Sequence, residues 1–270
     1  MKLKIYGCRG SAAFSRVSKY GGNTSCALLE SNDQVLVLDA GSGILGLEAD
    51  WRKKYENYPN DLPFDINVLL SHLHMDHIMG LPLFAPLWNV GASTRIFTNS
   101  RSDMSITEQV FGMFSPPYWP VFMKDQPYVE CVAVSDTFDI EGFTVTSFAA
   151  NHPNQTYSFH ITDGEKRVVY MLDCEMKGNW DNTKLIEHCT GADLVIFDAA
   201  YSVEDYPCKQ GWGHSTVQDG VALADATGCK RMMFSHYGQE YSDEDLDRIK
   251  ASVAGDDRFI FAYEGLELEI

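Results

Sequence analysis

The segment from His72 to His77 brings together four side chains that can bind a metal ion. Its sequence, His72-Leu73-His74-Met75-Asp76-His77, places three imidazoles and one carboxylate within six positions. A cluster that would repel itself if its histidines were protonated is rarely needed for packing. Such nitrogen and carboxylate donors favour zinc or another first-row ion, whereas magnesium and calcium prefer mostly oxygen ligands. We therefore predict a metal site; the competing interpretation is a polar loop that is rich in histidine.

Predicted strands explain how further ligands would reach this segment. The apolar stretch before it predicts a buried strand that delivers the histidines to its C-terminal end. Three more metal-binding residues, His152, Asp173 and His236, also come just after apolar stretches. A surface or core histidine would explain His152 or His236 alone, but the shared placement at strand ends favours one site. His160, inside a predicted strand, and His188, near a predicted helix end, are interpreted as structural.

Asp39 ends another apolar stretch and precedes a glycine-rich turn. We predict that its carboxylate accepts the free ring N–H of a metal-binding histidine, which would fix the tautomer and the basicity of that ring. The alternative is that Asp39 caps the predicted helix that begins at Ile44.

The segment from Ser71 to Pro82 resembles the HxHxDH signature of metallo-β-lactamase-fold hydrolases, in particular the branch of ribonuclease Z and cyclic phosphodiesterases. The resemblance covers nearly the whole chain, because further segments occur in the order expected of that branch. These segments are Tyr20-Gly21-Gly22-Asn23-Thr24-Ser25, Leu38-Asp39-Ala40-Gly41-Ser42-Gly43, Asn151-His152, Met171-Leu172-Asp173, Phe197-Asp198-Ala199, Gly213-His214-Ser215-Thr216 and Ser235-His236.

The resemblance implies an α/β fold of the αββα sandwich type, with the site along one sheet edge. The pattern of strands and helices alone indicates only an α/β protein. The resemblance also implies two divalent metal ions, with zinc as the first choice and manganese or iron as alternatives. The implied ligands are His72, His74 and His152 for one ion, Asp76, His77 and His236 for the other, and Asp173 as the bridge. Asp76 would also orient the attacking hydroxide.

His214 lies in a glycine-flanked segment that leads into a predicted helix. In the ribonuclease Z branch, a histidine in a similar His-Ser-Thr context assists phosphodiester cleavage together with an acidic residue, and Asp198 matches that residue. The resemblance thus implies that Asp198 holds His214 as imidazolium, able to bind a phosphoryl oxygen or to protonate the leaving alkoxide. The alternative gives both residues structural roles, as an N-cap neighbour and a buried turn residue.

Length and composition limit the organisation of the chain. At 270 residues with 45% apolar side chains, it can bury one substantial core, so we expect a single domain over residues 1–270. Predicted strands and helices alternate, including helices over residues 44–55 and 77–88. The sequence shows no signal peptide and no run of membrane-helix length, so a cytoplasmic protein without a membrane partner is expected. Its seven scattered cysteines contain no CxxC pair, which argues against disulfides and a thiolate zinc site.

Charge and motif spacing limit the substrate. A formal charge of −17 disfavours a long nucleic-acid partner. Ribonuclease Z proteins typically carry a long transfer-RNA arm between the residues matched by His152 and Asp173, which here are only 21 positions apart. We therefore expect a phosphodiesterase for a small phosphodiester, such as a cyclic nucleotide or dinucleotide. The alternatives are a carbonyl-ester or lactone hydrolase of the same superfamily and a non-hydrolytic protein resembling the PqqB cofactor-biosynthesis group.

Residues 111–123 form an aromatic insertion interrupted by prolines. The insertion would serve as a lid that covers the site, as a platform that stacks a base, or as a packed loop or dimer contact. The sequence leaves these alternatives open, and with them the exact substrate, the metal used in the cell and the question of a homodimer.

Overall fold

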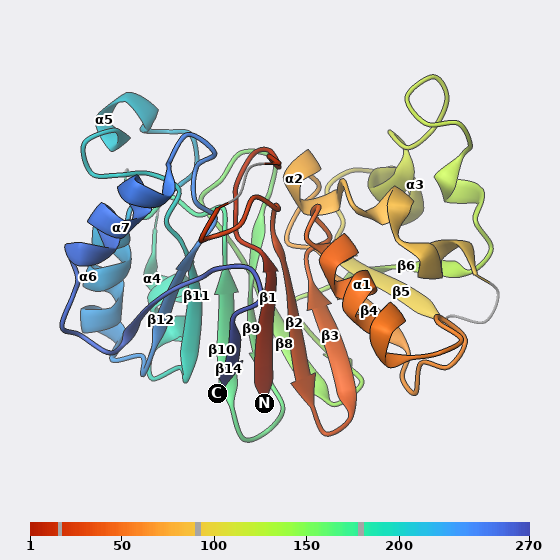
Figure 1. The fold of residues 1–270 in the computed structure, drawn as a ribbon, viewed down its shortest axis with the longest axis horizontal. Helices are drawn as coiled ribbons and strands as arrows, with labels where there is room; N and C mark the ends of the chain where they lie inside the picture. Colours follow the sequence, from red (N-terminus) through yellow and green to blue (C-terminus); the bar gives the residue numbers. More distant parts are fainter. Residues whose placement is uncertain (16–17, 90–92, 178–180) are drawn as a thin grey trace.

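Two seven-stranded sheets form the framework of the computed structural model, which describes residues 1–15, 18–89, 93–177 and 181–270 (Figure 1). The described helices lie outside the two sheets. This arrangement confirms the predicted α/β fold of the αββα sandwich type. Within the described ranges, no helix is both long enough and apolar enough to cross a membrane.

The first sheet has the strand order β14-β1-β2-β3-β4-β5-β6. Neighbouring strands from β14 to β3 pair antiparallel, whereas those from β3 to β6 pair parallel. The strands span Lys2–Gly7 (β1), Cys26–Ser31 (β2), Gln34–Leu38 (β3), Ile66–Leu69 (β4), Thr94–Asn99 (β5), Val129–Val134 (β6) and Glu267–Glu269 (β14).

The second sheet has the strand order β13-β12-β11-β10-β9-β8-β7. Strands β10 to β13 are parallel, and the pairs from β7 to β10 are antiparallel. The strands span Thr137–Ile140 (β7), Phe143–Ala149 (β8), Tyr157–Thr162 (β9), Arg167–Met171 (β10), Leu194–Asp198 (β11), Met232–Ser235 (β12) and Phe259–Phe261 (β13).

The helices are short, and two of them begin with a capping box. They span Ile44–Lys54 (α1), Met75–Ile78 (α2), Ile106–Phe111 (α3), Thr183–Cys189 (α4), Tyr206–Lys209 (α5), Val217–Thr227 (α6) and Asp243–Ala251 (α7). Thr216 and Ser242 each form a capping box at the start of α6 and α7.

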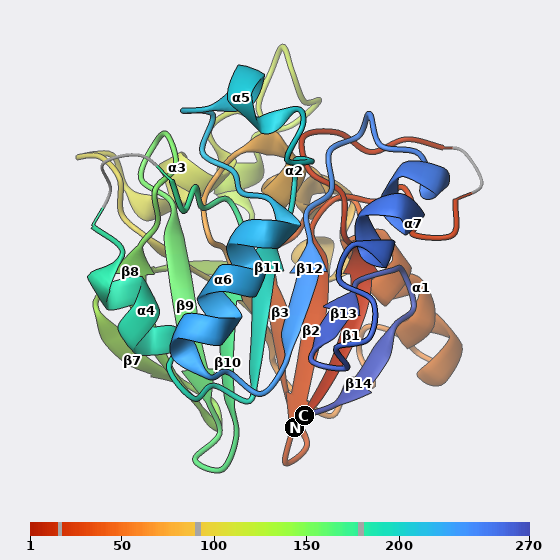
Figure 2. The same cartoon turned by 90° about the vertical axis from the view of Figure 1, so that its left-hand side faces the viewer.

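Alternate residues of the strands face two different apolar clusters. In β3, Leu36 and Leu38 belong to the cluster between the two sheets, whereas Val35 and Val37 belong to the cluster beneath α1. This alternation follows from the period of two along a strand and explains why β3 is apolar throughout. Figure 2 shows α1 on one side of the pair of sheets and α4 and α6 on the other.

The segment predicted as one helix over residues 77–88 is interrupted. Helix α2 ends at Ile78, and two separate 3₁₀ turns follow at Leu81–Leu83 and Ala85–Trp88. Pro82 and Pro86 lie near the start of these turns, and proline lacks the N–H that a continuous helix requires. The prediction of one helix was wrong because the two prolines interrupt the helix that the apolar spacing of this segment predicts.

Candidate metal centre

Two groups of metal-binding side chains meet at one edge of the sheets. In each group, one ligand atom per residue lies within 4.8 Å of the others. The first group consists of His72, His74, His152 and Asp173, and the second of Asp76, His77 and His236. A third group, Asp173, His214 and His236, shares a residue with each of them. The loops after β4, β8, β10 and β12 supply these residues, near α2 at the top of Figure 1. The structure therefore brings together all seven residues that the sequence predicted as ligands.

Asp173 lies between the two groups. Its Oδ1 is 3.5 Å from His152 Nε2 and 3.7 Å from His72 Nε2. Its Oδ2 is 3.0 Å from His77 Nε2 and 3.4 Å from His236 Nε2. With one oxygen directed toward each group, this carboxylate has the geometry of a bridging ligand.

Several atoms that face the centre lack hydrogen-bond partners of acceptable geometry within the described part of the chain. These buried atoms are Nε2 of His72, His77 and His236 and Oδ2 of Asp173. An unsatisfied buried polar group costs about 1–3 kcal/mol, so such groups are rarely left together without a ligand. The donor set of imidazoles and carboxylates therefore fits divalent metal ions.

Hydrogen bonds at the outer ring nitrogens turn Nε2 of three histidines toward the centre. His77 Nδ1 donates to Asp39 Oδ2 at 2.7 Å, and His152 Nδ1 donates to the Gly213 carbonyl oxygen at 2.9 Å. Carbonyl and carboxylate oxygens act as acceptors, so each Nδ1 is the donor. His236 Nδ1 lies 3.0 Å from the Ser25 hydroxyl. These contacts are of the kind that orient metal ligands and set their basicity.

Three residues of the site have a left-handed backbone. Asp39, Asp173 and His236 have φ angles of 56°, 54° and 64°, and each follows the end of a strand. This conformation is costly for residues other than glycine and is found mostly where function requires a particular side-chain direction. Asp173 and His236 thereby face each other at the centre, and Asp39 contacts the outer ring nitrogen of His77.

Asp39 does not cap helix α1. The N-cap of this helix is Gly43, and no side chain bonds to the helix start. Instead, the buried Asp39 carboxylate accepts from His77 Nδ1, from the Ser71 N–H at 2.8 Å and from the Tyr170 hydroxyl at 2.8 Å. The helix-cap alternative was therefore wrong, and the contact to a candidate ligand is the one predicted.

Replacing Asp39 with alanine is expected to weaken zinc binding by about 10- to 100-fold, because His77 loses the acceptor that fixes its tautomer. Competition with a chromophoric chelator measures this affinity. Asp103→Ala, a change at an exposed aspartate, serves as the control. Equal affinities for Asp39→Ala and wild type would show that this contact is irrelevant to the metal.

His214 and Asp198 form the pair predicted beside the ligands. His214 Nδ1 lies 2.7 Å from Asp198 Oδ2, and its ring stacks on His236 at 5.2 Å between centroids. Asp198 is fully buried, and its carboxylate also accepts from the N–H groups of Asp173, Ala200 and Ser215. Asp198 is therefore fixed in place and in turn fixes the direction of the His214 ring.

The environment of His214 favours its charged form in the protein without metal. Burial alone would lower the pKa of His214, but the Asp198 carboxylate outweighs burial and raises this pKa to about 9. Metal ions bound nearby would act in the opposite direction and lower the same pKa.

The two neighbouring ligands His72 and His77 differ in their electrostatics. Burial lowers the pKa of His72, so this ring is neutral and ready to donate a lone pair. Burial also acts to lower the pKa of His77, but the carboxylates of Asp173, Asp39 and Asp76 outweigh it and raise this pKa. A divalent ion at this point would replace the proton as the positive partner of the carboxylates.

Several supporting contacts were not predicted from the sequence. The Ser11 N–H donates to Asp76 Oδ2 at 2.7 Å. Arg101 donates to the carbonyl oxygens of Ser71 at 2.8 Å and Gln155 at 3.0 Å, so it ties together the loops that carry the ligand histidines. These contacts join residues far apart in the chain, so no local sequence pattern around Ser11 or Arg101 predicts them. Ser25 does lie in a segment that carries the family resemblance.

His160 and His188 lie outside the two ligand groups. Their rings are 5.8 Å apart, and His188 stacks on Phe148 at 4.4 Å. Both are half-buried, and their ring contacts are of the kind that packed histidines make.

The aromatic insertion at residues 111–123 has a buried and an exposed side. Phe111, Phe114 and Met123 belong to the apolar cluster beneath α1 and α3. Tyr118 and Phe122 project outward, and Tyr118 is 82% exposed. The insertion therefore packs through one side, as a structured loop does, and leaves aromatic rings on the other.

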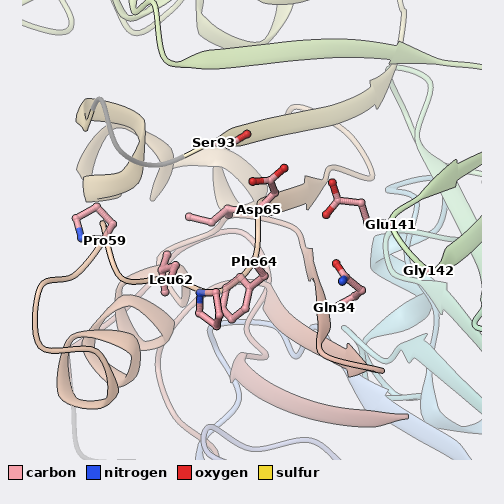
Figure 3. Close-up of a pocket in the computed structure, with 10 residues that line it drawn as sticks. Gln34, Pro59, Leu62, Phe64, Asp65, Ser93, Glu141 and Gly142 are labelled. Atoms are coloured by element: carbon pink, nitrogen blue, oxygen red, sulfur yellow. The ribbon is translucent and has the colours of Figure 1, made fainter.

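A separate hollow of about 690 Å³ lies at the opposite ends of the strands (Figure 3). Gln34 at the start of β3, Phe64 and Asp65 before β4, and Glu141 in the turn between β7 and β8 line it. No histidine or cysteine occurs among its lining residues. It therefore lacks the chemistry of the metal centre.

The sequence matches a family model and a curated relative. A model described as a beta-lactamase superfamily domain matches residues 35–237. A ribonuclease Z from Bradyrhizobium sp. (strain ORS 278) is 23% identical over 280 aligned positions, which cover 85% of this chain and 89% of the relative.

Solved structures show the same fold. Zinc-bound PqqB from Methylobacterium extorquens has a TM-score of 0.74 at 18% identity, with 100% of both chains covered. A diphosphatase of the PhnP family has a TM-score of 0.72 at 18% identity, with 100% of this chain and 96% of that chain covered. The family model spans most of the sequence, and the chain is a metal-dependent hydrolase of the beta-lactamase superfamily.

Proposed function

We propose that this protein is a binuclear-metal-dependent phosphodiesterase that acts on a small phosphodiester. The observation that carries the proposal is the His214–Asp198 pair, which is held beside two groups of metal ligands. Hydrolysis of an ester with a poor leaving group requires an acid at the departing oxygen, and His214 can supply one.

Each part of the site has a defined task in this proposal. When bound, two divalent ions would supply Lewis acidity, which lowers the pKa of a water molecule toward neutrality and withdraws charge from phosphoryl oxygens. Asp76, held by the Ser11 N–H, would orient the attacking nucleophile. His214 keeps its Nδ1 on Asp198 and presents Nε2 to the leaving oxygen as charge develops there.

The chain between His152 and Asp173 supports a small substrate. This interval contains the hairpin of β9 and β10, whose strands pair from Phe159 with Tyr170 to Thr162 with Arg167. Both strands lie within the second sheet, so no long arm emerges here to grip a folded RNA. The formal charge of −17 also supports a small substrate, because it repels a polyanion.

Bis(p-nitrophenyl) phosphate is expected to be hydrolysed in a zinc-dependent manner, and faster than p-nitrophenyl acetate or a simple lactone. The comparison uses one protein preparation and follows p-nitrophenolate release or proton release. Preference for the acetate or lactone would instead favour a carbonyl hydrolase, which needs the hydroxide but no acid at a phosphoester oxygen. A panel of cyclic mono- and dinucleotides would then identify the substrate.

Small phosphodiesters are expected to be cleaved more efficiently than precursor transfer RNA. Their rates should change little between about 50 and 200 mM salt, because few phosphate contacts form away from the metal centre. Both substrates can be assayed under equal conditions over this range. Efficient, strongly salt-dependent processing of the transfer RNA would contradict the proposed substrate class.

A further inference from the structure

Glu175 is a buried acidic residue that neither the ligand set nor the His214–Asp198 pair includes. It follows Asp173 by two positions, and only 4% of it is exposed. Within the described residues, no cation forms an ion pair with its carboxylate. A buried carboxylate is costly unless hydrogen-bond donors surround it, so its donors indicate what it holds.

The donors to Glu175 come from the loop before His214. The Gly211 N–H lies 2.9 Å from Oε1 and 3.0 Å from Oε2, and the Gly213 N–H lies 3.1 Å from Oε2. The Tyr206 hydroxyl donates to Oε1 at 2.5 Å. The carboxylate therefore binds two backbone N–H groups of one loop and anchors that loop to α5.

The same loop orients a candidate metal ligand. The carbonyl oxygen of Gly213 accepts from His152 Nδ1 at 2.9 Å, which leaves His152 Nε2 to face Asp173. The approach is so close that a Cβ at Gly213 would lie 2.2 Å from His152 Nδ1. Gly213 also has a φ of 89°, so the loop requires glycine here for both reasons.

The backbone of Glu175 holds the His152 loop from a second direction. The Glu175 N–H donates to the Asn151 carbonyl oxygen at 2.9 Å, and Asn151 Nδ2 donates to the Glu175 carbonyl oxygen at 2.8 Å. Glu175 thus joins three segments of the site: the one that carries Asp173, the one that carries His152 and the one that carries His214.

We propose that Glu175 is a positioning residue for the metal centre. Its carboxylate fixes the Gly211–Gly213 loop so that the Gly213 carbonyl sets the tautomer of His152 and so that His214 stays on Asp198. The inference rests on the metal centre of the proposed function but not on the identity of the substrate. Its effect should fall mainly on the ion held by the His72, His74 and His152 group, because His152 is the candidate ligand whose ring bonds directly to this loop.

Zinc affinity of Glu175→Gln and Glu175→Ala tests the proposal. Stepwise competition with a chelator is expected to show about 10- to 100-fold weaker binding of one of the two ions in Glu175→Ala. Glu175→Gln should lie between Ala and wild type, because its amide keeps one acceptor oxygen for the two loop N–H groups. Glu187→Gln, at an exposed glutamate of α4, is the matched control and should bind both ions as wild type does. Equal weakening of both ions, or none, in folded Glu175→Ala would overturn the proposal.

A measurement on metal-free protein separates this inference from the proposed function. In protein with ¹⁵N-labelled histidine, the His152 resonances, assigned from His152→Ala, should show a protonated Nδ1 in wild type and in Glu187→Gln. Glu175→Ala should lose this single tautomer, while its circular dichroism stays that of wild type. If wild type bound no zinc, the proposed function would fail, yet this tautomer shift would still support the role of Glu175. An unchanged His152 tautomer in Glu175→Ala would refute that role.

Discussion

Asp173→Ala is expected to lower phosphodiester hydrolysis by more than roughly 10³-fold, a larger loss than the removal of a single transition-state donor causes. The reason is its position, since one carboxylate oxygen faces each group of ligands. Asp173 is the carboxylate that five histidines face, His214 among them, and its removal leaves Asp76 as the remaining carboxylate among the candidate ligands. Elemental analysis should therefore find less metal per chain as well as less activity.

Two further variants make the Asp173 result specific. Asp173→Asn keeps the shape of the side chain but removes its charge, so it should also lose metal, which a purely steric role does not predict. Asp103→Ala, at an exposed position, should keep the metal content and rate of wild type. Unchanged metal content in Asp173→Ala would contradict the bridging assignment.

His214→Ala is expected to keep the metal and the fold while kcat falls by roughly 10² to 10⁴. His214 stacks on His236 and is held by Asp198, and its proposed role is at the leaving oxygen rather than as a metal ligand. The fall in kcat should therefore be smaller for a substrate that releases p-nitrophenolate, because this group leaves without protonation. It should be largest for a substrate with a poor alkoxide leaving group.

The comparison with other histidine variants decides between the roles of His214. His74→Ala should lose metal, and His188→Ala, a change outside the site, should leave rate and metal content near those of wild type. Equal defects of His214→Ala on both kinds of leaving group would mean that His214 only stabilises phosphoryl oxygens. Near-normal rates on both would make His214 and Asp198 parts of the scaffold.

The candidate ligands could be predicted from the sequence because they follow directly after apolar strands. A buried strand is apolar over several residues, so the first polar, metal-binding side chain beyond it stands out, as Asp173 and His236 do after β10 and β12. The sequence alone, however, predicted only an α/β protein. Pairing order between distant strands is not encoded in any local pattern, so the two-sheet sandwich depended on the family resemblance.

An element with a weak apolar pattern is difficult to predict from the sequence. Strand β14 has a single apolar residue, Leu268, and forms because β1 offers it an edge. In this case tertiary pairing, rather than intrinsic preference, decides the structure. Strand β6, at the other edge of the same sheet, is rich in valine but only partly buried.

The supporting contacts of the site were missed for a similar reason. Asp39 could be predicted as a partner of a ligand because it ends an apolar strand. Glu175 could not be assigned a role, because its carboxylate is satisfied by backbone N–H groups of Gly211 and Gly213. Backbone donors have no sequence signature, so only the folded loop shows what such a residue does.

Titration of metal-free protein with zinc, followed by hydrolysis of bis(p-nitrophenyl) phosphate, tests the central claim most directly. The two groups of ligands predict that the rate rises with added zinc and reaches its plateau at about two equivalents per chain. A rate that is independent of zinc, or that is complete at one equivalent, would contradict a binuclear phosphodiesterase.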